Sequence, residues 1–222
     1  MFLGHYGVGF ASKKVEPRAS LGTYIMAAVF LDLLWPIFLL IGLEHVKIDP
    51  GNTLVTPLNF YDYPYSHSLL MSVVWSVLFG AVYYLIKKDR KISAILGICV
   101  FSHWILDFIV HRADLPLAPG VETFFGLGLW NSLPATLIVE LLIFFVGFYL
   151  YLKTTKSKNK VGSIILWGFV ILLLLIYVLN LFSGSEPPNA NIIAISALGQ
   201  WLFVAWGYWI DKNRIIKDKG WK

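Results

Sequence analysis

The sequence has few charged residues and a single cysteine. Charged side chains make up 14% of its 222 residues, against about 25% in a typical soluble domain. Hydrophobic residues make up 58% of the chain, mostly in long runs, and the mean hydropathy is +0.71. This composition excludes an ordinary soluble domain and predicts a membrane protein with several spans. The single cysteine, Cys99, excludes an intramolecular disulfide.

Basic residues are concentrated in alternate connections between the apolar runs and are scarce in the others. The basic residues cluster before residue 19, at 87–91, at 153–160 and after 211. By the positive-inside rule these segments face the cytoplasm, so both termini are predicted to be cytoplasmic. A net charge of +5 distributed in this way reports orientation, and we expect no nucleic-acid partner. Because positive charge follows the first apolar residues, no cleavable signal peptide is expected.

Six apolar segments are long enough to cross a hydrocarbon core of about 30 Å. Residues 1–12 are also apolar, but at about 1.5 Å per residue they are too short to span, which predicts a half-buried or re-entrant helix. The predicted fold is therefore an all-α, polytopic membrane helical bundle that forms one domain over residues 1–222. In the first predicted span, Pro36 should introduce a kink or free a carbonyl. The six predicted spans cover about 21–43, 66–86, 92–111, 133–152, 161–182 and 191–210.

One predicted span carries a stripe of ionisable side chains. His103, Asp107 and His111 are spaced four residues apart, so a helix places them on one face. Asp114 follows at the end of this segment. Because ionisable groups at membrane depth are costly and are commonly kept for function, this stripe is the first candidate site.

Polar residues of other spans fall at similar depth. Counted from the predicted outer ends, Asp32, His103 and Glu140 lie roughly 12–15 Å deep. His67 begins the second span near the outer surface, and a folded-back N-terminal helix would bring His5 to mid-membrane. We therefore expect an outward-facing site built by residues 1–152, with two further apolar spans in 161–210.

These residue types suit a divalent metal, because imidazole and carboxylate are the usual ligands of zinc and related ions. One ion would be held by His103 and Asp107, with Asp32 and His67 completing its ligands. Asp107 would bridge to a second ion held by His5. A bound ion lowers the pKa of its water to about 7, which yields a nucleophile. The remaining polar residues, His111, Asp114 and Glu140, would be further ligands or acid–base groups.

Structural interpretations of the same residues remain open. A polar side chain in a span can simply form a hydrogen bond between helices. This applies to His67 and to Glu140, which could also pair with Arg112. It applies less well to the combination of His103, Asp107 and Asp32, because three costly groups share one depth.

The order of these residues resembles that of a known family, the membrane-bound metal-dependent hydrolases called YdjM-like or LexA-binding inner-membrane hydrolases. It is also similar to the ligand order of zinc-dependent phospholipase C and P1 nuclease. The resemblance covers roughly residues 1–140, and it implies the same two ligand sets, with His111 in a third set or in none. The chain has no histidine after His111 and no tryptophan before Trp35, so one or two ions are expected. The residues that carry the resemblance are His5, Asp32, His67, His103-xxx-Asp107 and His111.

The leading hypothesis is a membrane-embedded metal-dependent hydrolase that cleaves a phosphodiester or other ester of a lipid on the outer side. Its catalytic residues would be Asp107, His111 and Glu140, and its metal would be zinc, with manganese or iron as alternatives. The membrane lipid would be both substrate and solvent, and the bacterial inner membrane the location. A transporter or a proton or ion channel is the second hypothesis, because intramembrane Asp and His also build proton relays. A structural or partner-binding membrane protein is the third.

Overall fold

The computed structural model describes residues 1–182 and 186–217 and is 68% helical, which confirms the all-α prediction. Short antiparallel strand pairs join β1 (His45–Ile48) to β2 (Leu58–Asp62), β3 (Leu115–Pro116) to β4 (Phe124–Phe125), and β5 (Thr155–Ser157) to β6 (Arg214–Ile216). The helices are α1 (Phe2–Val15), α2 (Leu21–Ala28), α3 (Phe30–Leu40), α4 (Pro64–His67), α5 (Leu69–Lys87), α6 (Arg90–Val110), η1 (Leu129–Asn131), α7 (Leu133–Thr154), α8 (Lys160–Phe182), α9 (Ala190–Ala197) and α10 (Gln200–Lys212).

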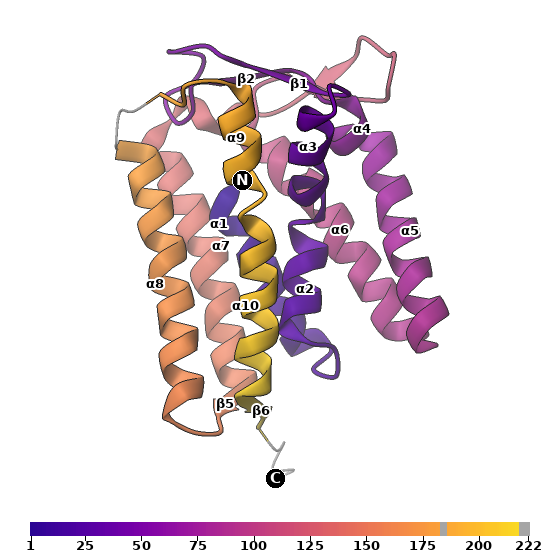
Figure 1. Ribbon diagram of the computed structural model, residues 1–222, viewed down its shortest axis with the longest axis vertical. Helices are drawn as coiled ribbons and strands as arrows, with labels where there is room; N and C mark the ends of the chain where they lie inside the picture. The colour runs from indigo at the N-terminus through magenta and orange to yellow at the C-terminus, as the bar shows by residue number, and fades with distance from the viewer. Residues whose placement is uncertain (183–185, 218–222) are drawn as a thin grey trace.

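The long helices lie side by side as a bundle (Figure 1). Within the described residues, five helical segments are long and apolar enough to cross a membrane: α5, α6, α7, α8, and α9 together with α10. The pair α2 and α3 passes the same test as a single span, bent by 56°. These five or six segments correspond to the six predicted spans and fit a multi-pass membrane protein.

The bend in the first predicted span lies at Val29, between α2 and α3. Seven residues later, Pro36 lies inside α3, which continues to Leu40. The sequence therefore indicates an irregular span correctly, but the bend lies at Val29 and not at Pro36. As shown below, the break matters because Ala28, the last residue of α2, contacts the candidate site.

The short helix α1 lies in the interior of the bundle, in contact with α2, α6, α7 and α8 (Figure 1). Glycines allow its closest contact, which is with α7. A Cβ atom added to Gly7 would lie 2.6 Å from the carbonyl oxygen of Ile143, and one added to Gly147 would collide with the backbone of Gly7. Because α1 is held this close to α7, its polar residue His5 is 1% exposed.

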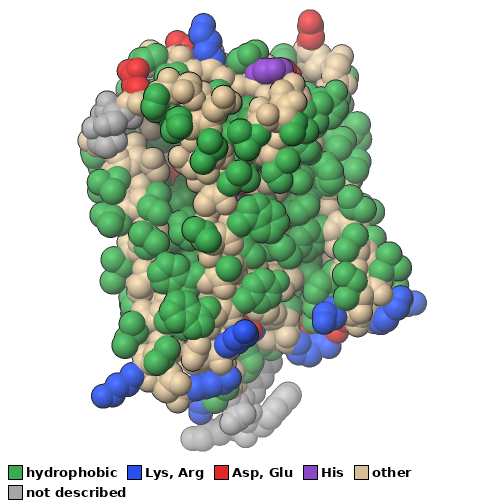
Figure 2. Space-filling view, in the orientation of Figure 1, with side chains coloured by type: hydrophobic (Ala, Val, Ile, Leu, Met, Phe, Trp, Pro, Cys, Tyr) green, Lys and Arg blue, Asp and Glu red, His purple; other side chains and the backbone are tan. Residues whose placement is uncertain are grey.

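The two ends of the bundle differ in charge, as Figure 2 shows. Lys and Arg gather at the end that carries β5 and β6, here called the basic end. The opposite end carries β1, β2 and α4 and is called the hairpin end. Apolar side chains cover the surface between them (Figure 2), and α5 and α8 expose many of theirs.

Ion pairs tie the helices together at the basic end. The carboxylate of Glu16 receives Arg18 Nε at 2.8 Å and Lys91 Nζ at 2.9 Å. Arg18 also reaches Asp89 at 2.6 Å, which links the α1–α2 connection to the start of α6. The hydrogen bonds from Arg18 lower the pKa of Glu16 to about 2.

Candidate metal centre

All five predicted metal ligands meet at one place in the bundle. His5 comes from α1, Asp32 from α3, His67 from α4, and His103 and Asp107 from α6. Their ligand atoms form two overlapping groups: one of His5, His103 and Asp107, and one of Asp32, His67 and His103. Within each group the atoms lie within 4.8 Å of one another. The geometry therefore fits one or two metal ions with His103 common to both groups.

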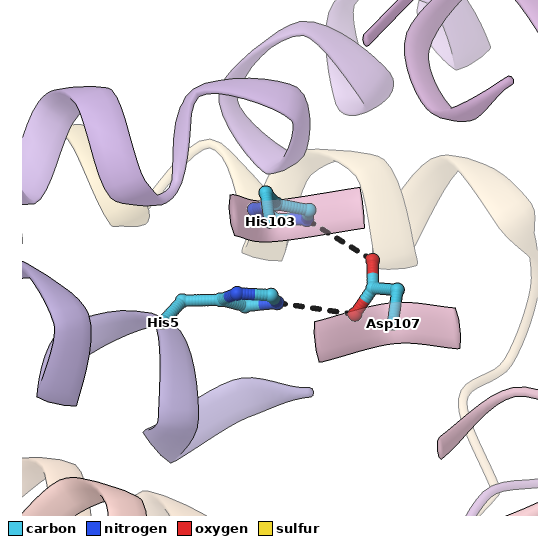
Figure 3. A group of neighbouring side chains, drawn as sticks. All are labelled: His5, His103 and Asp107. Atoms are coloured by element: carbon cyan, nitrogen blue, oxygen red, sulfur yellow. Dashed lines mark hydrogen bonds and ion pairs between the residues drawn. The ribbon is translucent and has the colours of Figure 1, made fainter. Parts of the chain in front are cut away.

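Asp107 lies beside two stacked histidines and reaches both of them (Figure 3). His5 Nε2 is 3.1 Å from Asp107 Oδ1, and His103 Nε2 is 3.1 Å from Asp107 Oδ2. Each oxygen of this carboxylate thus faces a different imidazole. The carboxylate is 2% exposed, and it also contacts the Met1 amine. A buried carboxylate with convergent nitrogens is suited to bridging cations.

The tautomer of His103 follows from its hydrogen bond to the α2 terminus. His103 Nδ1 lies 2.9 Å from the Ala28 carbonyl oxygen, which can only accept, so Nδ1 carries the proton. In the neutral ring, Nε2 then presents a lone pair to the oxygens of Asp107 and Asp32, the latter 3.7 Å away. Lone pairs facing one another in a buried site need a cation or proton between them.

His67 also has its Nδ1 engaged in a hydrogen bond, in this case with a serine. Its Nδ1 lies 2.7 Å from the Ser66 hydroxyl, which donates its own hydrogen to Glu44 at 2.7 Å. His67 therefore donates through Nδ1, and its Nε2 faces Asp32 Oδ1 at 3.5 Å. Two histidines from separate helices thus direct bare Nε2 atoms at the same carboxylate.

The predicted catalytic residue Glu140 belongs to α7, and its side chain lies beside the N-terminus of α1. Its Oε2 accepts the backbone N–H of Leu3 at 2.7 Å, and the side chain is buried. The carboxylate thereby satisfies a free donor at the N-terminus of a helix, where negative charge is favourable. Arg112, the alternative partner considered from the sequence, instead bonds Asp114 at 3.2 Å and Asn59 at 2.7 Å.

His111 and Asp114 form a pair beside the cluster. His111 Nδ1 lies 2.9 Å from Asp114 Oδ1, and the Tyr63 hydroxyl donates to the same oxygen at 3.1 Å. Because a carboxylate accepts, His111 donates through Nδ1 and its Nε2 is left as an acceptor. His111 also packs against Trp130, with ring centroids 4.3 Å apart. A carboxylate that fixes the tautomer of a histidine is a common arrangement for proton transfer.

A cavity of about 360 Å³ is lined by three of the five candidate ligands together with His111 and Glu140. Among its described lining residues there is no Lys or Arg, so no side chain there supplies a permanent positive charge. Residues of α8 and α9 complete its wall, which gives the last two apolar segments a part in the site. The polar lining includes Asp32, His67, Asp107, His111 and Glu140, and the apolar lining includes Phe2, Trp35, Phe60, Trp130, Leu181 and Ala197.

Three polar residues of the site have no role in the sequence-based prediction: Glu44, Ser66 and Tyr63. Ser66 had a weak signal, since it directly precedes His67. Glu44 and Tyr63 lie in the long connection between α3 and α4, where no periodic pattern marks which side chains point inward. The remaining histidine, His45, begins β1 and pairs with Asp62 at 2.7 Å on the surface, away from the site.

Comparison of the chain with protein-family models, with curated proteins and with solved structures finds no match. The resemblance to membrane-bound metal-dependent hydrolases therefore stays a prediction from the order of five ligand residues and His111.

Proposed function

We propose that the protein is a membrane-embedded metal-dependent hydrolase whose substrate is a lipid ester or phosphodiester. The observation that carries the proposal is the convergence of two histidines with fixed tautomers on two carboxylates. Hydrogen bonds to Ala28 and Ser66 occupy the Nδ1 atoms of His103 and His67. Their Nε2 atoms are thereby left as ligands beside Asp32 and Asp107. This arrangement suits zinc, with manganese or iron as alternatives.

The residues present divide into two ligand sets. Asp32, His67 and His103 would hold one ion, and His5 with Asp107 would hold a second. A bound divalent ion supplies Lewis-acid polarisation and water acidic enough to attack an ester near neutral pH. The chain itself would orient the ligands and exclude bulk water from a cavity whose deep residues are almost fully buried.

His111 is the proposed proton carrier. It lines the cavity, and its Nδ1 is committed to Asp114. Its Nε2 is thus free to take a proton from, or return one to, a group bound in the cavity. Glu140 lines the same cavity and is the second candidate acid–base group, although one of its oxygens serves the α1 terminus.

A lipid substrate is supported by the cavity wall. Aromatic and aliphatic side chains such as Trp35, Phe60 and Leu181 line it, and the outer surface of the bundle is apolar. Such a wall suits an amphiphile better than a highly charged soluble metabolite. With the basic end in the cytoplasm, the cavity would open toward the outer side. Cysteines introduced at Asn52 and Lys156 should then react with impermeant reagents from opposite faces.

The transporter alternative requires a polar route from the site to the basic end. Farther along α1, toward the basic end, Tyr6 and Phe10 are fully buried. Phe10 packs edge-on against Phe144 and Phe148 at ring-centroid distances of 6.0 and 5.4 Å. This aromatic layer supports an enzyme with access from one side over a transport pathway.

The direct test is metal analysis of the purified protein in detergent. We expect close to one or two equivalents of zinc, manganese or iron in the wild type and loss of bound metal in His103→Ala. The matched control is His45→Ala, because His45 is an exposed histidine outside the site. A wild-type protein that neither retains nor rebinds these metals would refute the proposal.

A further inference from the structure

Glu44 has no part in the ligand set, yet it is a buried carboxylate close to it. It lies between α3 and β1 and is 1% exposed. Its Oε1 accepts the backbone N–H groups of Tyr65 and Ser66 at 2.8 and 2.7 Å, and its Oε2 accepts the Ser66 hydroxyl at 2.7 Å. Three donors on one carboxylate hold the first turn of α4 in a fixed position.

The direction of these hydrogen bonds determines how Ser66 bonds to His67. A serine hydroxyl has one hydrogen, and here it is donated to Glu44. The Ser66 oxygen can then only accept from His67 Nδ1, 2.7 Å away. Burial raises the pKa of Glu44, and the hydrogen bonds from Ser66 and Tyr65 oppose that effect by favouring the ionised form.

The hydrogen bonds from His67 through Ser66 to Glu44 disfavour the other neutral tautomer of His67. If Nδ1 lacked an acceptor, the neutral ring could carry its proton on Nε2 and donate it to Asp32, 3.5 Å away. That bond would occupy both groups and remove two ligands from the cluster. With Nδ1 committed to Ser66, the neutral ring keeps Nε2 bare.

We propose that Glu44 and Ser66 act as positioning residues that hold His67 as a metal ligand through the relay Glu44–Ser66–His67. The inference rests on the proposed metal site. The relay also connects two candidate ligands. Asp32 lies on α3, and Glu44, four residues after the end of α3, forms hydrogen bonds with α4, the helix that carries His67. Hydrogen-bond partners behind a metal-bound histidine commonly contribute about 10–100-fold to metal affinity.

Ser66→Ala is the sharpest test, because it removes the acceptor for His67 but leaves Glu44 bonded to the backbone of α4. Apo-protein in detergent would be titrated with Zn²⁺ against a competing chelator, and with Co²⁺ to record its visible absorption. We expect Zn²⁺ to bind about 10–100-fold more weakly and the Co²⁺ bands to shift, with the thermal midpoint close to that of the wild type.

Two variants make the result specific. Ser66→Thr keeps a hydroxyl and should restore the affinity. Ser68→Ala removes a neighbouring buried serine that caps α5 through Met71 and whose hydroxyl forms no hydrogen bond with the His67 side chain, so its Zn²⁺ affinity should equal that of the wild type. Equal affinity and equal Co²⁺ spectra for Ser66→Ala and wild type would overturn the inference while leaving the metal site standing. A wild-type protein that binds neither ion would instead refute the proposed function.

Discussion

The imidazole rings of His5 and His103 stack in parallel, with centroids 3.6 Å apart and planes 5° apart. The rings belong to α1 and α6, and each directs its Nε2 at a different oxygen of Asp107. One carboxylate therefore contacts both rings. The contribution of each histidine can be separated by counting ions.

We predict that His5→Ala and His103→Ala each lose a different ion. The proposed ligand sets place His103 with Asp32 and His67, and His5 with Asp107. In a protein that binds two ions, each variant should keep about one equivalent and the double variant none, as measured by elemental analysis of the folded fraction. Loss of both ions in His5→Ala alone would contradict the division into two sets.

The contact between α1 and α7 should tolerate no side chain. In Gly147→Ala the new Cβ would collide with the backbone of Gly7, and overpacking of this kind costs about 1–3 kcal/mol. We expect a lower thermal midpoint and a lower metal content, because α1 carries His5. Gly168→Ala on α8 is the control: its Cβ would lie 3.6 Å from Trp206, an ordinary contact. A Gly147→Ala protein as stable as Gly168→Ala would argue against the close packing.

Asp114→Asn should separate proton transfer from metal binding. The change weakens the acceptor that fixes the tautomer of His111, and acid–base groups commonly contribute roughly 10²–10⁴-fold to rate. We expect a loss in that range in hydrolysis of a fluorogenic lipid ester or phosphodiester in mixed micelles, with unchanged metal content. Asp62→Asn alters the exposed His45–Asp62 pair and should leave the rate unchanged. Full activity in Asp114→Asn would remove His111 from the proposed mechanism.

The lowered pKa of Glu16 makes the stability of the folded protein depend on pH. Its hydrogen bonds from Arg18 lower its pKa from about 4.5 to about 2, so ionised Glu16 stabilises the folded state above pH 4.5. That stabilisation is lost as the pH falls from about 4.5 toward 2. The thermal midpoint should therefore decline over this range, and the decline should be shallower in Glu16→Gln. Glu122→Gln, at an exposed loop position, should follow the wild-type curve; identical curves for all three proteins would contradict the assignment.

Hydropathy and ligand spacing predicted much of this structure from the sequence. The apolar segments correspond to the helices, and the residues chosen for their cost at membrane depth, such as Asp32 and His103, lie together. Periodicity could reveal the stripe on α6 because helical geometry is local.

The remaining features depend on tertiary contacts. Pro36 is a strong local signal for an irregular helix, yet the break occurs at Val29, where nothing in the sequence marks it. The partnership of Glu44 with Ser66 joins residues 22 positions apart through an irregular connection. Likewise, the burial of α1 depends on two glycines that are far apart in the sequence, Gly7 and Gly147.

The pairing of α1 with α7 has a consequence for biosynthesis. At about 5–20 residues per second, the ribosome needs on the order of ten seconds to proceed from the end of α1 to the start of α7. During that interval, α1 has no glycine partner and is too short to cross the bilayer alone. The last ligand helix, α6, is complete before α7 begins, so we expect the close packing that buries His5 to form only once α7 is made. Completion of the candidate metal centre would then wait for a helix that supplies none of its five ligands.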